Sequence, residues 1–152
     1  MTQLTLNDTD RLAALIAAKL QVVEILERLA RKQLALVESG DAGVLLKLLA
    51  AKQTVLAQLQ ALERQLDPFR AQDPECRPWP SPAHRAQCQA QADRCTKLLA
   101  ETMELEKQGE AALAARRDAV SSALASTQAA ADARTAYAPV SLPAAANLHC
   151  EG

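Results

Sequence analysis

Four side chains that can ligate a metal ion lie close together in the second half of the sequence. They are Cys76, His84, Cys88 and Cys95. On a helix His84 and Cys88 share one face, and Cys95 follows two turns later. Thiolate and imidazole ligands can form a tetrahedral zinc site, but no CxxC pair or standard zinc spacing is present. We therefore favour buried structural thiols beside a surface histidine, and keep a small metal-binding bundle as an alternative.

The remaining residues carry no pattern of a catalytic site. The sequence has no hydrolase elbow, Walker loop, dinucleotide-binding glycine pattern or HExxH motif. Glu101, Glu104 and Glu106 lie close together, but no Glu-x-x-His partner accompanies them, as a di-iron bundle would require. We expect no enzymatic activity and no cofactor.

Composition predicts a soluble helical protein. Hydrophobic residues make up 49% of the 152 residues but aromatic residues only 2%, so Leu, Val, Ile and Ala must form the core. The 17 basic and 18 acidic residues are mixed, which argues against a nucleic-acid partner. No apolar run is long enough to cross a bilayer, and the N-terminus lacks the pattern of a signal peptide. We expect no membrane insertion and a cytoplasmic location.

Apolar periodicity predicts an antiparallel helical hairpin in the first half of the chain. The first helix is expected over residues 8–38, capped by Thr9 or Asp8, with an apolar line seven residues apart: Leu15, Val22, Leu29 and Leu36. Gly40 can close this helix in the left-handed conformation, and Asp41 can cap the next one. The second helix is expected over 42–66, ended by Asp67-Pro68. Its stripe comprises Leu45, Leu48, Leu49, Val55, Leu56, Leu59, Leu62 and Leu66.

Charged residues interrupt these apolar stripes at a few places. Lys19, Lys47 and Lys52 lie within or beside them. We expect their methylene stems to run along the seam between helices while the ammonium groups stay in water.

A proline-rich loop and one very long helix are predicted for the second half. The loop covers 67–81, and we expect Trp79 and Phe69 to plug the open end of the hairpin, with an exposed recognition aromatic at Trp79 as the alternative. Ser81 and Pro82 suit the start of a helix over 82–136, in which Gly109 is a candidate kink. The predicted fold is all-α, a hairpin plus a long third helix in a three-helix bundle or coiled-coil-like arrangement. It forms one domain over 1–136, followed by a flexible tail over 137–152.

The second half of the third helix is the predicted partner-binding surface. Small residues dominate there, and the large apolar side chains are Leu113, Val120 and Leu124. An alanine-rich face lets another helix approach closely, and these three residues would anchor it. The same face could instead form a homodimer seam.

The segment 34–66 resembles the FlgN family of flagellar export chaperones. The resemblance is carried by the leucine-rich helix, the Ser39-Gly40-Asp41 turn and the Leu-x-x-Leu pattern around Lys52. The long third helix fits the same plan, so the likeness extends over roughly residues 10–136. The proline-rich loop and the cysteine cluster depart from the family pattern.

This resemblance implies a cytoplasmic chaperone of the flagellar type III export system. Its partners would be the flagellar hook-associated proteins of the hook–filament junction, whose C-terminal amphipathic helices it would bind and keep from premature assembly. In that family binding is attributed to the C-terminal helical region, which maps onto Leu113, Val120 and Leu124. The alternative is a self-associating coiled-coil adaptor protein without a secretion client.

Overall fold

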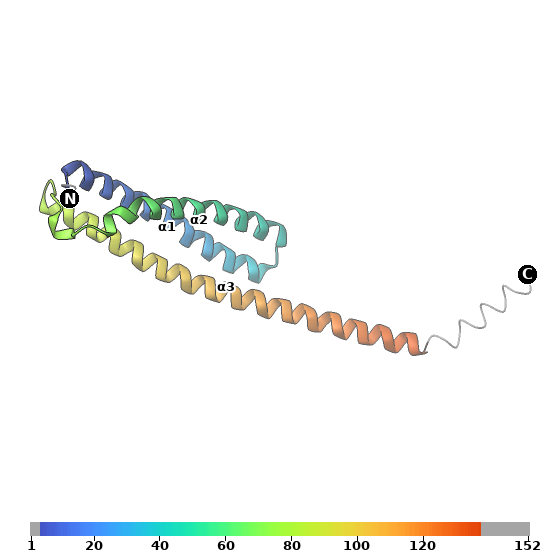
Figure 1. The fold of residues 1–152 in the computed structure, drawn as a ribbon. Helices are drawn as coiled ribbons and strands as arrows, with labels where there is room; N and C mark the ends of the chain where they lie inside the picture. The colour runs from blue at the N-terminus through green and yellow to red at the C-terminus, as the bar shows by residue number, and fades with distance from the viewer. Residues whose placement is uncertain (1–3, 138–152) are drawn as a thin grey trace, which may run out of the picture. The chain divides into compact units, whose positions relative to one another are not determined.

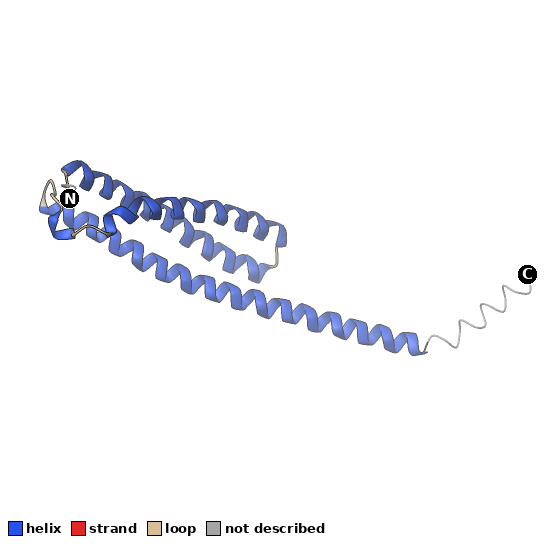
Figure 2. Cartoon of the chain, viewed as in Figure 1, coloured by secondary structure: helices blue, strands red, loops and turns tan. Residues whose placement is uncertain are grey.

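The computed structural model describes residues 4–137 and has three α-helices (Figures 1 and 2). The helices are α1 (Leu6–Ser39), α2 (Ala42–Arg70) and α3 (Pro82–Tyr137), and a short 3-10 helix, η1 (Pro74–Cys76), lies between α2 and α3. No strand is present among these residues. The all-helical fold with a very long third helix, 56 residues, is confirmed.

The chain divides into two compact units, and the division falls inside α3. The first unit ends at Ala112 and the second begins at Leu113, whereas the sequence analysis expects one domain to residue 136. Every residue from Ala115 to Tyr137 is exposed, including the apolar Val120 and Leu124. α3 is one helix through Gly109, without the break that glycine could introduce. Of the predicted flexible tail over 137–152, Tyr137 belongs to α3, and residues 138–152 lie outside the described residues.

α1 begins at Leu6, two residues before the predicted start at residue 8. The cap is Thr5, not Thr9 or Asp8: the Thr5 hydroxyl accepts from the Asp8 amide at 3.2 Å, and the Asp8 carboxylate accepts from the Thr5 amide at 2.8 Å. This reciprocal pair is a capping box. Thr9 is instead buried, and its hydroxyl donates to the Pro78 carbonyl at 2.8 Å. The threonine thereby ties the loop before α3 to α1.

The turn between α1 and α2 has the predicted caps. Gly40 has φ 80°, in the left-handed region, and its amide donates to the Leu36 carbonyl at 2.9 Å. The Asp41 carboxylate then accepts from the Val44 amide at 3.1 Å and begins α2. The short turn brings α2 back along α1 as an antiparallel neighbour (Figure 1).

α2 continues past Pro68, where the sequence analysis ends it at Leu66. A proline in the last turn removes only one backbone hydrogen bond. The extra turn buries Phe69 in a cluster with Leu12, Leu15 and Leu66, and burying such a side chain contributes about 1.5–3 kcal/mol. This gain offsets much of the cost of the proline. The loop therefore begins at residue 71 instead of 67, and Trp79 packs against the same cluster as predicted.

The three helices of the first unit meet along heptad seams, in which every residue is buried or half-buried. In α1 the seam is Thr9, Leu12, Ile16, Lys19, Val23, Leu26, Ala30, Gln33 and Val37. In α2 it is Leu45, Leu48, Lys52, Val55, Leu59, Leu62, Leu66 and Phe69. In α3 it is Cys88, Gln91, Cys95, Leu98, Thr102, Leu105, Gly109 and Ala112.

The α1 seam is not centred on the predicted line of Leu15, Val22, Leu29 and Leu36. Of these four, only Leu15 is buried. The observed seam includes Lys19, whose methylene stem is expected there, and Gln33, which apolar periodicity does not indicate. Both polar side chains are accommodated because groups on neighbouring helices bind them, as described below.

One edge of the α3 seam consists of small side chains. Cys88, Cys95, Thr102 and Gly109 follow one another at seven-residue spacing, and all four are buried. At Gly109 a β-carbon would lie 3.7 Å from Gln33 Nε2, an ordinary van der Waals distance. There is accordingly room for a methyl group where α3 passes α1.

We predict that Gly109→Ala stabilises the protein. Alanine lowers the conformational entropy of the unfolded chain, so the free energy of unfolding should rise by about 0.5–1 kcal/mol. Urea denaturation followed by far-UV circular dichroism measures this change. The control is Gly40→Ala, which must lower stability because residue 40 has φ 80°. A less stable Gly109→Ala variant would show that α3 lies closer to α1 than described.

Candidate helix-binding groove

A long groove runs between α2 and α3 on the first unit, with α1 as its floor. It consists of two hollows, and we refer to both together as the α2–α3 groove. The larger hollow, about 480 Å³, is lined by Leu26 of α1, by Lys52, Leu56 and Leu59 of α2, and by Leu99, Thr102, Met103, Glu106, Lys107 and Glu110 of α3. The smaller, about 260 Å³, is lined by Leu12, Ile16, Lys19, Leu66, Phe69, Arg70, Arg77, Gln89, Ala92, Cys95 and Thr96.

The two hollows lie in line along the same face. As the lining residues of α2 run backwards from 70 to 52, those of α3 run forwards from 89 to 110. The span of 21 residues on α3 corresponds to about 30 Å of helix. Such a length accommodates an added helix of about five to six turns.

The larger hollow exposes apolar side chains. Met103 is 69% exposed, and Leu56, Leu59 and Leu99 on the walls are half-buried. Methionine is unbranched and polarisable, so it adapts to partners of different shape. A contiguous exposed apolar surface usually marks a site of association, whereas single exposed apolar residues are common on any protein.

α2 is more apolar than its packing requires. By length and composition alone it could cross a membrane, although only 11% of its most apolar 18-residue window is buried. Polar residues interrupt the apolar runs of α2, so the length of those runs does not indicate the high mean hydropathy of the window. Core helices of water-soluble bundles pass the same test, but their apolar window is then mostly buried. α2 therefore retains apolar surface that α1 leaves uncovered.

Two polar clusters cross the groove and hold the helices in register. Lys52 of α2 donates to the Gln33 amide oxygen of α1 at 3.1 Å and also pairs with Glu106 of α3. At the smaller hollow, Lys19 of α1 lies 2.6 Å from Glu63 of α2. Specific polar pairs at seam positions fix which levels of the helices face one another. The predicted placement of these lysine ammonium groups in water is therefore wrong for Lys19 and Lys52.

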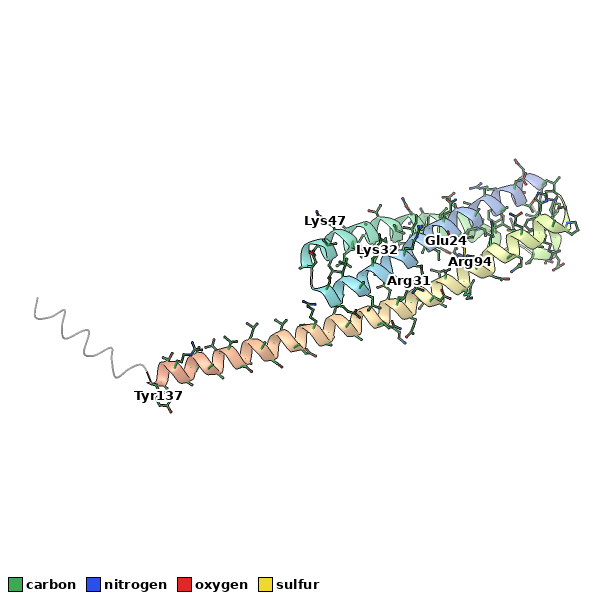
Figure 3. The ribbon with its side chains drawn as sticks, turned by 180° about the vertical axis from the view of Figure 1, so that it is seen from behind. Glu24, Arg31, Lys32, Lys47, Arg94 and Tyr137 are labelled. Carbon is green, nitrogen blue, oxygen red and sulfur yellow. The ribbon has the colours of Figure 1, made fainter. Side chains whose placement is uncertain are left out.

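The charges around Glu63 keep it ionised. Partial burial raises the pKa of this carboxyl, but hydrogen bonds and charge from Lys19 and Arg70 outweigh the burial and lower the pKa overall. Arg70 also pairs with Asp67. A separate pair, Glu24 and Arg94 at 3.6 Å, joins α1 to α3 (Figure 3).

The loop end of the groove is rich in cations. Lys19, Arg70 and Arg77 line the smaller hollow, and no carboxylate lines it. Arg77 donates from Nη2 to the Phe69 carbonyl at 2.6 Å, which closes the end of α2. Its Nε is buried and has no hydrogen-bond partner among residues 4–137.

The predicted partner-binding residues lie on the second unit. Leu113 is half-buried, while Val120 and Leu124 are 52% and 64% exposed. Their spacing places all three on one side of α3. The described part of this unit is a single helix that ends at Tyr137 (Figure 3), so the three residues form a stripe instead of a groove.

The four candidate metal ligands do not converge. Cys76 is exposed and its thiol lies 3.4 Å from Asp73, while the exposed His84 lies 2.6 Å from the Ser81 hydroxyl. Cys88 and Cys95 are buried in the α3 seam. Within the described part of the chain, no group of three or more His, Cys, Asp or Glu side chains is placed to hold a metal ion.

Sequence reasoning missed the groove although it listed part of its wall. Leu56 and Leu59 belong to the predicted stripe of α2, but the stripe itself does not indicate that a groove lies beside it. The available signal was an excess of leucines: α2 has Leu49 and Leu56 beyond those that its seam requires. Arg77 and Met103 carry no sequence signal of their own.

Comparison of the chain with family models, curated proteins and solved structures found no match.

We predict unequal reactivity of the three described thiols. Burial raises the pKa of Cys88 and of Cys95, which lowers the thiolate fraction at pH 8. The Asp73 carboxylate raises the pKa of Cys76 as well, but that thiol is exposed. In a Cys150→Ser background, Ellman's reagent should modify Cys76 readily and the other two only after denaturation. Rapid modification of all three would mean that α3 separates from the hairpin in solution.

Proposed function

We propose that this protein is a chaperone that binds an amphipathic helix of another protein in the α2–α3 groove. The observation that carries the proposal is the apolar groove itself, which exposes Met103 between two helices and has the length of a further helix. An added helix would complete a four-helix arrangement and bury its own apolar stripe at the same time. Association of this kind needs no covalent chemistry or nucleotide.

The resemblance of residues 34–66 to the FlgN family supports a particular client. We propose that the bound helices are those of flagellar hook-associated proteins, which must stay unassembled in the cytoplasm until they are exported. A helix that buries its apolar face in a filament needs temporary cover for the same face beforehand. A groove whose exposed wall includes a flexible methionine suits reversible binding of more than one such sequence.

The groove offers more apolar surface than the stripe of Leu113, Val120 and Leu124. Contacts in the groove come from three helices, whereas the stripe offers a single convex surface. We therefore place the principal docking contact in the groove. The stripe stays a prediction, and the same experiment tests it.

The groove proposal predicts that Met103→Asp weakens client binding. The new carboxylate would have to lose water against an apolar partner, so the dissociation constant should rise about tenfold, equivalent to about 1.4 kcal/mol. Fluorescence anisotropy with labelled C-terminal peptides of the hook-associated proteins from the same genome measures it. Leu46→Asp is the matched control, since Leu46 is 67% exposed on α2 and does not line the groove.

The variant Leu113→Asp/Leu124→Asp distinguishes the two surfaces. Binding that survives this double substitution but not Met103→Asp supports the groove. The reverse result would move the client to the second unit and leave the chaperone function intact. If no peptide binds and the protein is a stable homodimer, the chaperone proposal fails and the self-associating adaptor is favoured.

A further inference from the structure

We propose that the α2–α3 groove binds its client helix in one direction, with the helix C-terminus and its free carboxylate at Arg77. This inference rests on the proposed function, because it specifies how the client lies in that groove. The resemblance to the FlgN family already implies a C-terminal client helix; the inference adds its direction in the groove and the group that receives its carboxylate.

The direction follows first from the charge at the two ends of the groove. Lys19, Arg70 and Arg77 line the smaller hollow; Glu63 and Asp67 pair with the first two, which leaves the charge of Arg77 uncompensated. The larger hollow has two lysines and two glutamates among its lining residues, Lys52, Lys107, Glu106 and Glu110, and these charges balance. A helix carries partial negative charge at its C-terminus, to which a free carboxylate adds a full charge. The cationic end therefore favours the client's C-terminus.

Arg77 is the cation best placed to receive the carboxylate. Lys19 already pairs with Glu63, and Arg70 pairs with both Glu63 and Asp67. Arg77 has no ion pair with any residue of the described chain, and its buried Nε has no hydrogen-bond partner. Because Nη2 donates to the Phe69 carbonyl at 2.6 Å, the Nη1 group is the part of this planar guanidinium left to donate to a carboxylate.

The surroundings of Arg77 supply a further unused donor. A third hollow, about 80 Å³, adjoins the smaller hollow of the groove. The two share Leu12, Arg77 and Gln89, and the third is also lined by Trp79 and Arg85. The Trp79 indole N–H is buried and likewise has no partner within residues 4–137. Arg85 pairs with Glu75, so Arg77 is the cation at this closed end that has no ion pair among the described residues.

A double-change cycle, which combines amidation of the peptide C-terminus with Arg77→Gln, tests the carboxylate contact. The probes are the hook-associated C-terminal peptides, each made with a free acid and with an amidated C-terminus. For the wild-type protein, amidation should weaken binding about tenfold, since a charge-assisted contact is lost. In Arg77→Gln the acid and the amide should bind equally, because the two changes remove the same interaction. Arg64→Gln is the control: Arg64 is exposed on α2 and lines neither hollow.

The single tryptophan reports the direction without any variant. Trp79 lies at the loop end, so a nitroxide in the last turn of the peptide should quench its fluorescence. A nitroxide in the first turn of a peptide of about 20 residues would lie about 30 Å away and should not quench it.

The outcomes separate this inference from the function on which it rests. Equal affinity of acid and amide for the wild-type protein, or quenching by the first-turn nitroxide alone, overturns the direction while the groove still binds a client. Sensitivity to Arg77→Gln without sensitivity to amidation also overturns it, since the arginine would then bind a side-chain carboxylate. If neither peptide form binds, both the function and the inference fail.

Discussion

The apolar surface of α2 is too large for one neighbouring helix to cover, and the arrangement of the first unit follows from this constraint. α1 covers the seam that includes Leu48, Val55 and Leu66. The leucines beside that seam, Leu56 among them, stay half-buried and face the groove. An uncovered apolar wall costs free energy in water at about 25 cal/mol per Å². A helix supplied by another protein would remove that cost.

The polar groups of the bundle determine where that cover can be added. Lys52 spans from Gln33 to Glu106, and Lys19 meets Glu63, so the helices are fixed in register at two levels. Replacing a single partner of such a pair would leave a charge without compensation. Fixed register keeps the groove open at a constant position, with its apolar wall at one end and its cations at the other. Apolar side chains thus supply the affinity of the proposed complex, while Arg77 supplies its direction.

The elements could be predicted from local signals, and their packing could not. Gly40 and Asp41 specify the turn between α1 and α2 by their own backbone and capping preferences, so those boundaries were correct. Pro68 predicts a helix end from its local backbone preference. The burial of Phe69, a tertiary contact, extends α2 past it. The groove depends on which apolar residues a third helix leaves uncovered. Contacts between helices far apart in the sequence decide which residues these are, and periodicity along a single helix gives no information about such contacts.

The most direct test of the account is methyl NMR of the protein during titration with a client peptide. The chain has two methionines, Met1 and Met103, so a sample labelled at the methionine methyl carbons gives a simple spectrum. If the α2–α3 groove is the docking site, the Met103 methyl signal shifts and gains nuclear Overhauser contacts to apolar side chains of the peptide. A peptide that binds while the Met103 methyl signal keeps its position and gains no such contact would contradict the account.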